Sequence, residues 1–314
     1  MQSAQIEIEA SGKVRLREKV VAQAPASSSE THDREKRHLV PLNARWLHAL
    51  GVTNAAGRPR EGMSAKLRQI QKFTEVLCSL LIEAGLIAPS MEDMEADSPP
   101  PFTIADMGCG KGYLTFATAS VLGPRARVVG VETRADLVKL CSEVARQAGM
   151  ESLSFVQGDI ASTELPRNNG CEVLIALHAC DTATDDALAR GVAAGARLLV
   201  VSPCCQKELR PQMQPPAILA DALRHGIFLE RQAEFVTDAL RAQLLEWAGY
   251  RTKVFEFVST EHTARNIMIA AIKDHPPGQQ GRLHRLRNFA RFYGVRSQAL
   301  ARHLGVDLAA EEES

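Results

Sequence analysis

The chain has 314 residues, of which 45% are hydrophobic, 24% charged and 5% aromatic, and its 37 basic residues balance its 37 acidic ones. This composition is typical of a globular protein with a sizeable core and excludes collagen-like and disordered classes. No apolar run approaches the roughly 18 residues that a membrane-spanning helix needs, and the first ten residues lack the pattern of a signal peptide. We therefore expect a cytoplasmic protein with no membrane partner, and we expect reduced thiols at its seven cysteines.

The first 98 residues are predicted to form two regions outside the main domain. Residues 3–22 alternate between polar and apolar side chains around a Ser-Gly pair, which predicts a hairpin, and residues 1–38 are expected to hold this hairpin and a flexible linker. Residues 39–98 have helical spacing, with an apolar stripe in the second helix. We interpret the polar residues of that helix as a solvated face: Lys66, Arg68, Gln69 and Lys72.

Residues 99–274 alternate short β-rich runs with helical stretches of about a dozen residues, which predicts parallel strands joined by crossover helices. The expected strands are Phe102–Met107, Arg127–Val131, Leu153–Gln157, Glu172–Leu177, Arg197–Val201, Lys253–Val258 and Asn266–Ile272. Only a short loop separates the last two, so they are expected to be antiparallel. The predicted fold class is α/β, with a mostly parallel seven-stranded sheet and an antiparallel last strand.

Residues 275–314 form a basic tail that is expected to be helical. Its arginines have no acidic neighbours and alternate with three aromatic residues: Arg282, Arg285, Arg287, Arg291, Arg296 and Arg302, with Phe289, Phe292 and Tyr293. Such a stripe can lie along phosphates and stack on bases. Alternatively, its apolar residues pack the tail onto the domain and leave the arginines in water.

A glycine-rich turn between the first predicted strand and its helix is the strongest local signal. It reads Asp106-Met-Gly108-Cys-Gly110-Lys-Gly112, and glycines at such a turn let a ligand approach the backbone beside a helix N-terminus. A phosphate-binding P-loop needs Ser or Thr where Gly112 follows the lysine, and the dinucleotide fingerprint needs a third glycine where Tyr113 stands. Both of those ligand classes fit poorly.

The remaining form, Asp-x-Gly-x-Gly-x-Gly, resembles motif I of the class I S-adenosylmethionine-dependent methyltransferases, and this resemblance implies their Rossmann-like fold and S-adenosylmethionine as cofactor. It implies that Asp106 and the backbone of Gly108, Gly110 and Gly112 hold the methionine part of that cofactor. It further implies that Glu132, after the second strand, accepts hydrogen bonds from the ribose hydroxyls. Asp159 and Ile160, after the third strand, would contact the adenine, because ligands of open α/β sheets collect at the carboxyl ends of strands.

Polar and sulfur groups follow the fourth and fifth strands and the last loop, and we expect them at the same rim: His178, Cys180, Asp181, Cys204, Cys205, Lys207, His262 and Arg265. These blocks resemble the methyltransferase domain shared by eukaryotic tRNA 2′-O-methyltransferases and many bacterial homologues, over about residues 70–272. Gln206 stands where a histidine often follows the cysteine pair of that family. The sequence suggests His178 as a general base beside the cofactor, oriented by Asp181, with Lys207 or Arg265 steadying a developing oxyanion.

The rim thiols leave two alternatives open. Cys180 with Cys204 or Cys205 resembles the layout of RNA cytosine-5 methyltransferases, which use covalent catalysis. The same thiols with His178 and His262 could instead form a zinc site, although we predict no metal. The expected function is methyl transfer to RNA, at a ribose 2′-oxygen or a base, with no obligate protein partner evident. Methylation of a small molecule or protein, and a binding module without activity, are the alternatives.

Overall fold

The computed structural model describes residues 3–8, 14–19, 38–89, 100–163, 170–177, 179, 181–203, 206–214, 216–257 and 267–310. The chain divides into two compact units, residues 1–37 and 38–314. The first unit holds an antiparallel hairpin of β1 (Ser3–Ile8) and β2 (Val14–Lys19), in which Ser3 pairs with Lys19. The predicted hairpin is therefore confirmed.

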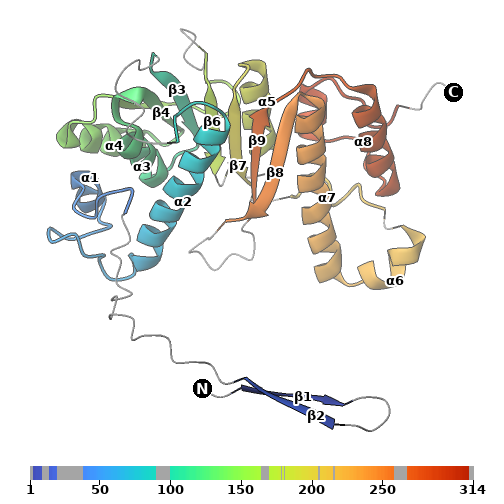
Figure 1. Ribbon diagram of the computed structural model, residues 1–314. Coiled ribbons are helices and arrows are strands. Elements are labelled where there is room, and N and C mark those ends of the chain that lie inside the picture. Colours follow the sequence, from blue (N-terminus) through green and yellow to red (C-terminus); the bar gives the residue numbers. More distant parts are fainter. Residues whose placement is uncertain are drawn as a thin grey trace. The chain divides into compact units, whose positions relative to one another are not determined.

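The second unit is built on a seven-stranded sheet with the order β5-β4-β3-β6-β7-β9-β8 (Figure 1). Its strands are β3 (Phe102–Met107), β4 (Ala126–Glu132), β5 (Leu153–Gln157), β6 (Val173–Leu177), β7 (Leu198–Ser202), β8 (Tyr250–Glu256) and β9 (Ile267–Lys273). Neighbouring strands from β5 to β7 are parallel, and β9 lies antiparallel between β7 and β8. This is the predicted mostly parallel sheet with an antiparallel last strand.

The predicted strand boundaries agree with the structure to within one residue, except for β8. This strand begins at Tyr250, three residues before the expected Lys253. Tyr250 is 1% exposed and its hydroxyl donates a hydrogen bond to the carbonyl of Ala196 at 2.8 Å. The buried side chain of Tyr250 thus fixes the start of β8. The polar residues that follow Tyr250 gave no sign in the sequence that the strand begins there.

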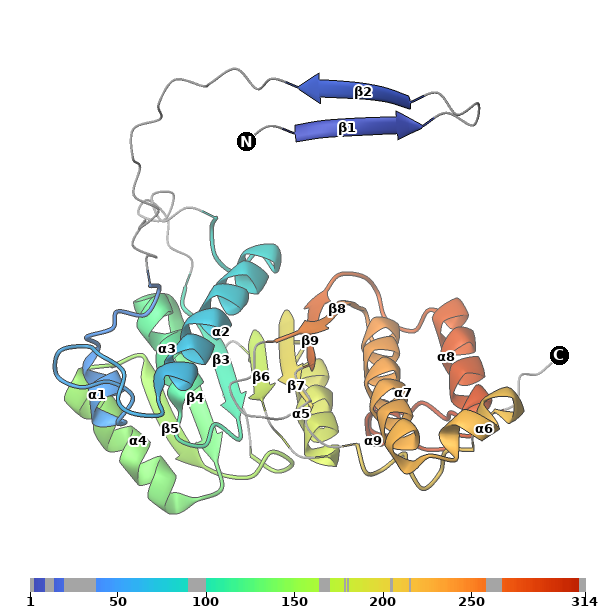
Figure 2. The same ribbon diagram turned by 90° about the horizontal axis from the view of Figure 1, so that it is seen from below.

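Helices cover both faces of the sheet because the buried strands carry apolar side chains on alternating sides. The helices are α1 (Arg45–Ala49), α2 (Ser64–Glu83), α3 (Tyr113–Leu122), α4 (Ala135–Ala148), α5 (Thr182–Ala193), α6 (Ala220–Leu223), α7 (Gly226–Trp247), α8 (Gln280–Phe292) and α9 (Ala299–His303), with short 3₁₀ turns at Gly123–Arg125 and Ala217–Leu219. In β7, Leu198 and Val200 join a core formed with α1–α4, whereas Leu199 and Val201 join a core formed with α5 and α7–α9. Figures 1 and 2 show α2–α4 toward the β5 end of the sheet and α7 and α8 toward the β8 end.

The basic tail packs onto the second core. Leu286 in α8 is fully buried, and Phe289 contacts Tyr293 and Phe235 of α7. Two of its arginines make ion pairs with the domain, namely Arg282 with Glu246 and Arg302 with Glu208, and Arg287 donates to the carbonyl of Asp307. Packing of the tail is therefore confirmed, while Arg285, Arg291, Phe292 and Arg296 remain exposed.

Candidate active site

The loop after β3 folds over the end of β4. The backbone N–H groups of Gly108 and Cys109 both donate to the carbonyl of Val131, at 2.8 and 3.0 Å. Gly108, Gly110 and Gly112 have φ values of 71°, 58° and 68°, a left-handed conformation that costs other residues free energy. These glycines therefore explain how the backbone turns so tightly between β3 and α3.

The carboxylate of Glu132, the last residue of β4, closes this loop. Its Oε2 atom accepts a hydrogen bond from the N–H of Gly110 at 2.8 Å. Its Oε1 atom accepts bonds from Thr133 Oγ1 and from the backbone N–H and Nε of Arg134, at 3.1–3.2 Å. Burial alone would raise the pKa of Glu132, but the bonds from Arg134 and Gly110 outweigh it, and the net pKa is below its ordinary value. Glu132 is thus a fixed, ionised group.

Asp106 is the second acidic group at this edge of the sheet. It is 5% exposed, and its Oδ2 atom accepts a hydrogen bond from Thr115 Oγ1 at 2.6 Å. Burial raises the pKa of Asp106 to about 7, although the bond from Thr115 opposes the shift. Asp106 therefore changes charge near neutral pH.

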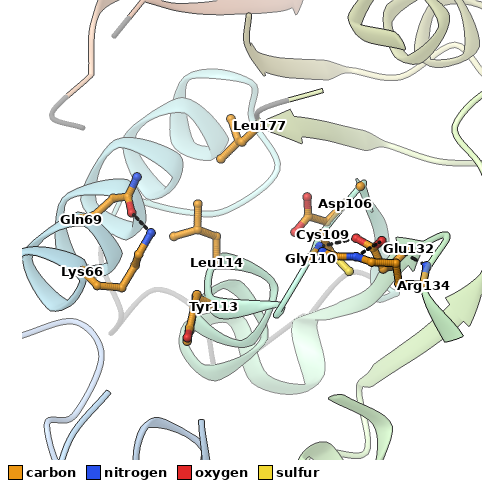
Figure 3. A pocket seen from close by; sticks show the side chains of 11 residues that line it. Lys66, Gln69, Asp106, Cys109, Gly110, Tyr113, Leu114, Glu132, Arg134 and Leu177 are labelled. Carbon is orange, nitrogen blue, oxygen red and sulfur yellow. Dashed lines mark hydrogen bonds and ion pairs between the residues drawn. The ribbon is translucent and has the colours of Figure 1, made fainter. Parts of the chain in front are cut away.

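Both carboxylates line one cavity of about 390 Å³ (Figure 3), a volume in the usual range for small-molecule sites. The lining residues are Lys66, Gln69, Asp106, Gly108, Cys109, Gly110, Tyr113, Leu114, Glu132, Arg134 and Leu177. Residues from α2 thus take part in the site. The interpretation of the polar residues of α2 as a solvated face is wrong for Gln69, which is 2% exposed, and for Lys66, which is half-buried.

Of the two residues predicted to contact the adenine, Ile160 lies beside the glycine loop, whereas Asp159 lies outside the cavity. A Cβ atom on Gly108 would lie 3.5 Å from Ile160 Cδ1, so Ile160 is adjacent to the glycine loop. Asp159 is exposed and does not line the cavity, and its carboxylate accepts hydrogen bonds from the N–H groups of Ala161 and Ser162 at 2.8 and 2.9 Å. The role of both residues remains a prediction.

The loops after β6 and β7 are joined through Asp181. Its Oδ1 atom accepts hydrogen bonds from the N–H groups of Lys207 and Glu208, at 3.0 and 3.3 Å, while the side chain of Lys207 is exposed. The other predicted rim residues lie outside the described residues: His178, Cys180, Cys204, Cys205, His262 and Arg265.

A buried charge network lies behind these loops. Arg241 of α7 is 1% exposed and makes two hydrogen bonds to the carboxylate of Asp185, at 2.7 and 2.9 Å, and one to Asp238 at 3.0 Å. It also donates to the carbonyl of Asp181 at 3.0 Å, and Gln298 Nε2 donates to Asp185 at 2.6 Å. Asp181 has a φ of 52°, which is uncommon outside glycine. The network therefore holds a strained residue beside the rim.

Neither a metal site nor a membrane span is found in the part of the chain that the structure describes. No three His, Cys, Asp or Glu residues there are placed to hold a metal ion, and no described helix is both long and apolar enough to cross a bilayer. The proposed zinc ligands lie outside the described residues. Among the described thiols, burial raises the pKa of Cys141 and Cys171 to about 11.

Part of the chain is similar to known methyltransferases. Residues 65–212, just under half of the chain, match a family described as a methyltransferase domain. Nocamycin O-methyltransferase from Saccharothrix syringae is 31% identical over 70 residues, and the chain covers only 25% of the length of that relative and 22% of its own.

Solved structures with related folds include Aeropyrum pernix fibrillarin with bound S-adenosyl-L-methionine and cofactor-bound Rv0187 from MTB. The fibrillarin structure is 17% identical, the match covers 62% of this chain and 74% of the fibrillarin chain, and the TM-score is 0.38. The Rv0187 structure is 18% identical, the match covers 75% of this chain and 91% of the Rv0187 chain, and the TM-score is 0.42. Both TM-scores are below 0.5, so the similarity to a methyltransferase domain rests on the family match. Residues 65–212 are thus similar to a methyltransferase domain.

Proposed function

We propose that the cavity at the ends of β3 and β4 binds S-adenosylmethionine and that the chain transfers its methyl group to RNA. The observation that carries the donor site is the pair Asp106 and Glu132, which project from adjacent strand ends into one cavity. Glu132 is ion-paired with Arg134 and offers hydrogen-bond acceptors. The buried carboxylate of Asp106, when ionised, favours a cationic group, and S-adenosylmethionine carries a sulfonium and an ammonium group.

The residues present fit this cofactor. Oε2 of Glu132 accepts a hydrogen bond from the N–H of Gly110, whereas Oε1 accepts three hydrogen bonds from Thr133 and Arg134. Because a carboxylate oxygen has two lone pairs, Oε2 can also accept a bond from a ribose hydroxyl. The positive-φ glycines keep side chains away from the backbone beside it. By resemblance, Asp106 and this backbone hold the methionine part, and Ile160 lies beside the adenine.

Titration calorimetry with S-adenosylhomocysteine tests the donor site. We expect saturable binding to the native chain, with NAD⁺ and ATP as control nucleotides that bind at least about tenfold more weakly. Absence of both heat and a thermal shift with S-adenosylhomocysteine would contradict the proposal and favour a binding module that has lost the donor.

The proposed acceptor class rests on a surface formed by α7 and α8. α7 has 22 residues and spans about 33 Å, whereas the seven residues of β8 span about 23 Å. α7 ends just before Tyr250, the first residue of β8. Tyr250 pairs with Lys273, the last residue of β9, and Ile272 beside it pairs with Leu198, the first residue of β7. The end of α7 therefore lies at the amino edge of the parallel strands. The first turns of α7 therefore extend past the carboxyl edge, where the loops after β6 and β7 lie.

Aromatic and basic side chains are exposed on α7, on α8 and just after α8, and we call them together the α7–α8 surface: Phe228, Phe235, Arg291, Phe292 and Arg296. The ring of Phe235 on α7 packs against Phe289 on α8, which joins the two helices. The three phenylalanines are 53–55% exposed, and both arginines are exposed. Exposed rings that can stack on bases, beside cations that can bind phosphates, suit a single-stranded or looped RNA. The resemblance to tRNA 2′-O-methyltransferases supports the same class of acceptor.

Two measurements test the RNA acceptor. Radiolabelled methyl donor is incubated with the chain and fractionated cellular RNA, protein and metabolites, and we expect label in RNA; label in metabolites alone would favour a small-molecule acceptor. In filter binding, the double variant Arg291→Gln, Arg296→Gln should lower the slope of log affinity against log salt by about 1–2. Arg146→Gln on α4 is the control, since Arg146 pairs with Glu143 on a different exposed helix.

The catalytic roles proposed for the rim follow from what methyl transfer requires. Bound S-adenosylmethionine supplies an electrophilic methyl carbon, so the chain has to align the acceptor and take up its proton. We propose His178 as the group that accepts this proton and Asp181 as the residue that positions the rim. A pH–rate profile whose acidic limb disappears in His178→Gln would agree with this role. Unchanged turnover in each of Cys180→Ser, Cys204→Ser and Cys205→Ser would remove the covalent alternative.

A further inference from the structure

The loop after β5 folds back on itself around Asp159. The Oδ1 atom of Asp159 accepts hydrogen bonds from the N–H groups of Ala161 and Ser162 at 2.8 and 2.9 Å, and its Oδ2 atom accepts one from the hydroxyl of Ser162. The backbone carbonyl of Asp159 accepts two more bonds, from the N–H and the hydroxyl of Thr163 at 3.1 and 2.6 Å. Asp159 thus closes a tight turn over residues 158–163, which we call the β5 turn.

The β5 turn is fixed at both of its ends. At its start, the N–H of Gly158 donates to the backbone carbonyl of Glu132 at 3.1 Å, and the carboxylate of Glu132 lines the donor cavity. At its end, the guanidinium of Arg190 donates through Nη1 to the carbonyl of Ala161 and through Nη2 to that of Thr163. Arg190 belongs to α5, so the turn is held between β4 and a helix from a later part of the chain.

The β5 turn has no room to adopt another shape around its first residue. A Cβ atom on Gly158 would lie 2.0 Å from Thr163 Oγ1, so the end of the turn closes directly over the backbone of its start. Ile160 lies between the two fixed ends, and its Cδ1 atom would be 3.5 Å from a Cβ atom on Gly108. The fixed turn therefore holds Ile160 against the glycine loop.

The carboxylate of Asp159 is occupied by this turn. A carboxylate has roughly four lone-pair sites, and three of them accept donors from Ala161 and Ser162. These hydrogen bonds, those from Ser162 above all, hold the pKa of Asp159 below its ordinary value. The side chain is exposed and does not line the donor cavity. The amino group of an adenine would have to compete with donors of the chain itself for this carboxylate.

We infer that Asp159 and Arg190 are positioning residues of the donor site: they fix the β5 turn so that Ile160 packs against the nucleoside, and the carboxylate of Asp159 does not read the base. This inference rests on the proposed function, because it assigns roles at the nucleoside end of the same cavity. It makes donor affinity depend on the shape of the turn and not on the charge of Asp159.

Two ligands that differ at one position of the base test the role of Asp159. S-inosylhomocysteine carries a carbonyl oxygen where S-adenosylhomocysteine carries an amino group, which is a hydrogen-bond donor. Titration calorimetry measures both ligands with the native chain, Asp159→Asn and Asp159→Ala. Asp159→Asn should keep the native ratio of the two affinities within about twofold, since an asparagine can close the same turn. Asp159→Ala opens the turn and should weaken both ligands by the same factor, about three- to tenfold.

Arg190→Met tests the other fixed end of the turn. It removes two hydrogen bonds from a charged donor and should weaken S-adenosylhomocysteine about three- to tenfold, while Arg190→Lys should retain part of the affinity. Arg197→Met is the matched control, because Arg197 also donates to two backbone carbonyls, those of Ala84 and Gly85 at 2.6 and 3.1 Å, at the end of α2. It should leave donor affinity unchanged, and circular dichroism verifies that each variant is folded.

The outcomes distinguish this inference from the proposed function. If the native chain binds neither ligand, the proposed donor site is wrong. If the native chain binds and Asp159→Asn reverses or abolishes the preference between the two bases, Asp159 reads the base. If Asp159→Ala or Arg190→Met binds with native affinity, or if Arg197→Met loses as much affinity as Arg190→Met, the turn does not position the nucleoside. Each of these last results overturns the inference and leaves the donor site standing.

Discussion

The proposed donor cavity and the rim formed by the loops after β6 and β7 are built by different kinds of contact. In the donor cavity, hydrogen bonds join the loop after β3 to the end of β4: the N–H of Gly108 donates to the carbonyl of Val131, and the N–H of Gly110 donates to the carboxylate of Glu132, 22 residues away. At the rim, Arg241 reaches back 56 residues to Asp185 and 60 residues to the carbonyl of Asp181. The first site depends on local turn chemistry, whereas the second depends on a helix that joins the sheet later in the chain.

This difference predicts that the two sites can be damaged separately. Contacts that are distant and share no partner have nearly additive effects, and the Arg241 network contains none of the residues that line the donor cavity. Loss of the Arg241 network should therefore impair the rim and the stability of the fold more than it impairs donor binding. Changes at the glycine loop should impair donor binding more than they impair the rim.

Arg241→Met is expected to have the largest effect. It leaves the carboxylates of Asp185 and Asp238 buried without their cation, and breaking such a pair costs about 3–5 kcal/mol. Urea denaturation should show this loss in the free energy of unfolding. Affinity for S-adenosylhomocysteine should stay within about threefold under conditions where the variant is folded.

Arg146→Met is the control for Arg241→Met, because Arg146 also pairs with a carboxylate at i,i+3 but is exposed. We expect no measurable shift of its unfolding midpoint. If Arg241→Met unfolds at the native midpoint, or if it loses donor binding together with stability, the two sites are not separable in the way that the contacts indicate.

Asp106→Asn comes next and acts on the donor side. The folded pKa of about 7 lies above the ordinary value of 3.8, so between these values the folded chain holds a proton that the unfolded chain has released. The contribution of Asp106 to stability therefore falls as the pH rises from 3.8 to about 7. Removing the charge should raise the free energy of unfolding at pH 8 by roughly 1–4 kcal/mol, with little gain below pH 4.

The same variant should bind the donor less well. A cationic ligand requires the ionised carboxylate, so native affinity should rise with pH up to about 7, and Asp106→Asn should weaken binding by at least about thirtyfold at pH 8 and flatten this dependence. Calorimetry at several pH values measures both effects. Native binding that is independent of pH between 5.5 and 8 would show that Asp106 does not face the cationic part of the ligand.

Most of the sheet and the glycine loop could be predicted from the sequence because their signals are local. Strand runs, turn glycines and the residue after each strand follow directly from hydrophobic patterning. The part of α2 in the cavity could not be predicted this way: Lys66 and Gln69 look like an ordinary polar face, and only the packing of α2 against α3 turns that face toward the loop. For Arg241, a faint signal exists, since Asp238 and Arg241 lie three residues apart on the apolar face of α7, but their partner Asp185 is distant in sequence.

Gly130→Ala should have an intermediate effect, confined to the donor side. A Cβ atom on Gly130 would lie 2.6 Å from the Phe155 ring and 2.9 Å from the sulfur of Cys109, so the side chains of Phe155 and of Cys109 in the glycine loop would have to move. Overpacking of this kind costs about 1–3 kcal/mol, and affinity for S-adenosylhomocysteine should fall with it. Gly226→Ala is the control, because nothing lies within 4 Å of its Cβ position, and it should be neutral or slightly stabilising.

The smallest effect is expected at Cys109, a thiol of the donor cavity. Burial, together with the nearby Asp106 carboxylate, raises the pKa of the Cys109 thiol far above its ordinary value, and a protonated thiol is a poor nucleophile. Iodoacetamide at pH 8, with peptide mapping by mass spectrometry, should label Cys109 only after unfolding, and Cys109→Ser should change donor affinity by less than about threefold. Fast labelling of Cys109 in the folded chain would show that its thiol is ionised beside the donor. Such a result would contradict the expectation that this side chain only packs against its neighbours. If Cys180, Cys204 or Cys205 is labelled quickly while Cys109 is not, reactive sulfur belongs to the rim alone, where a covalent step would need it.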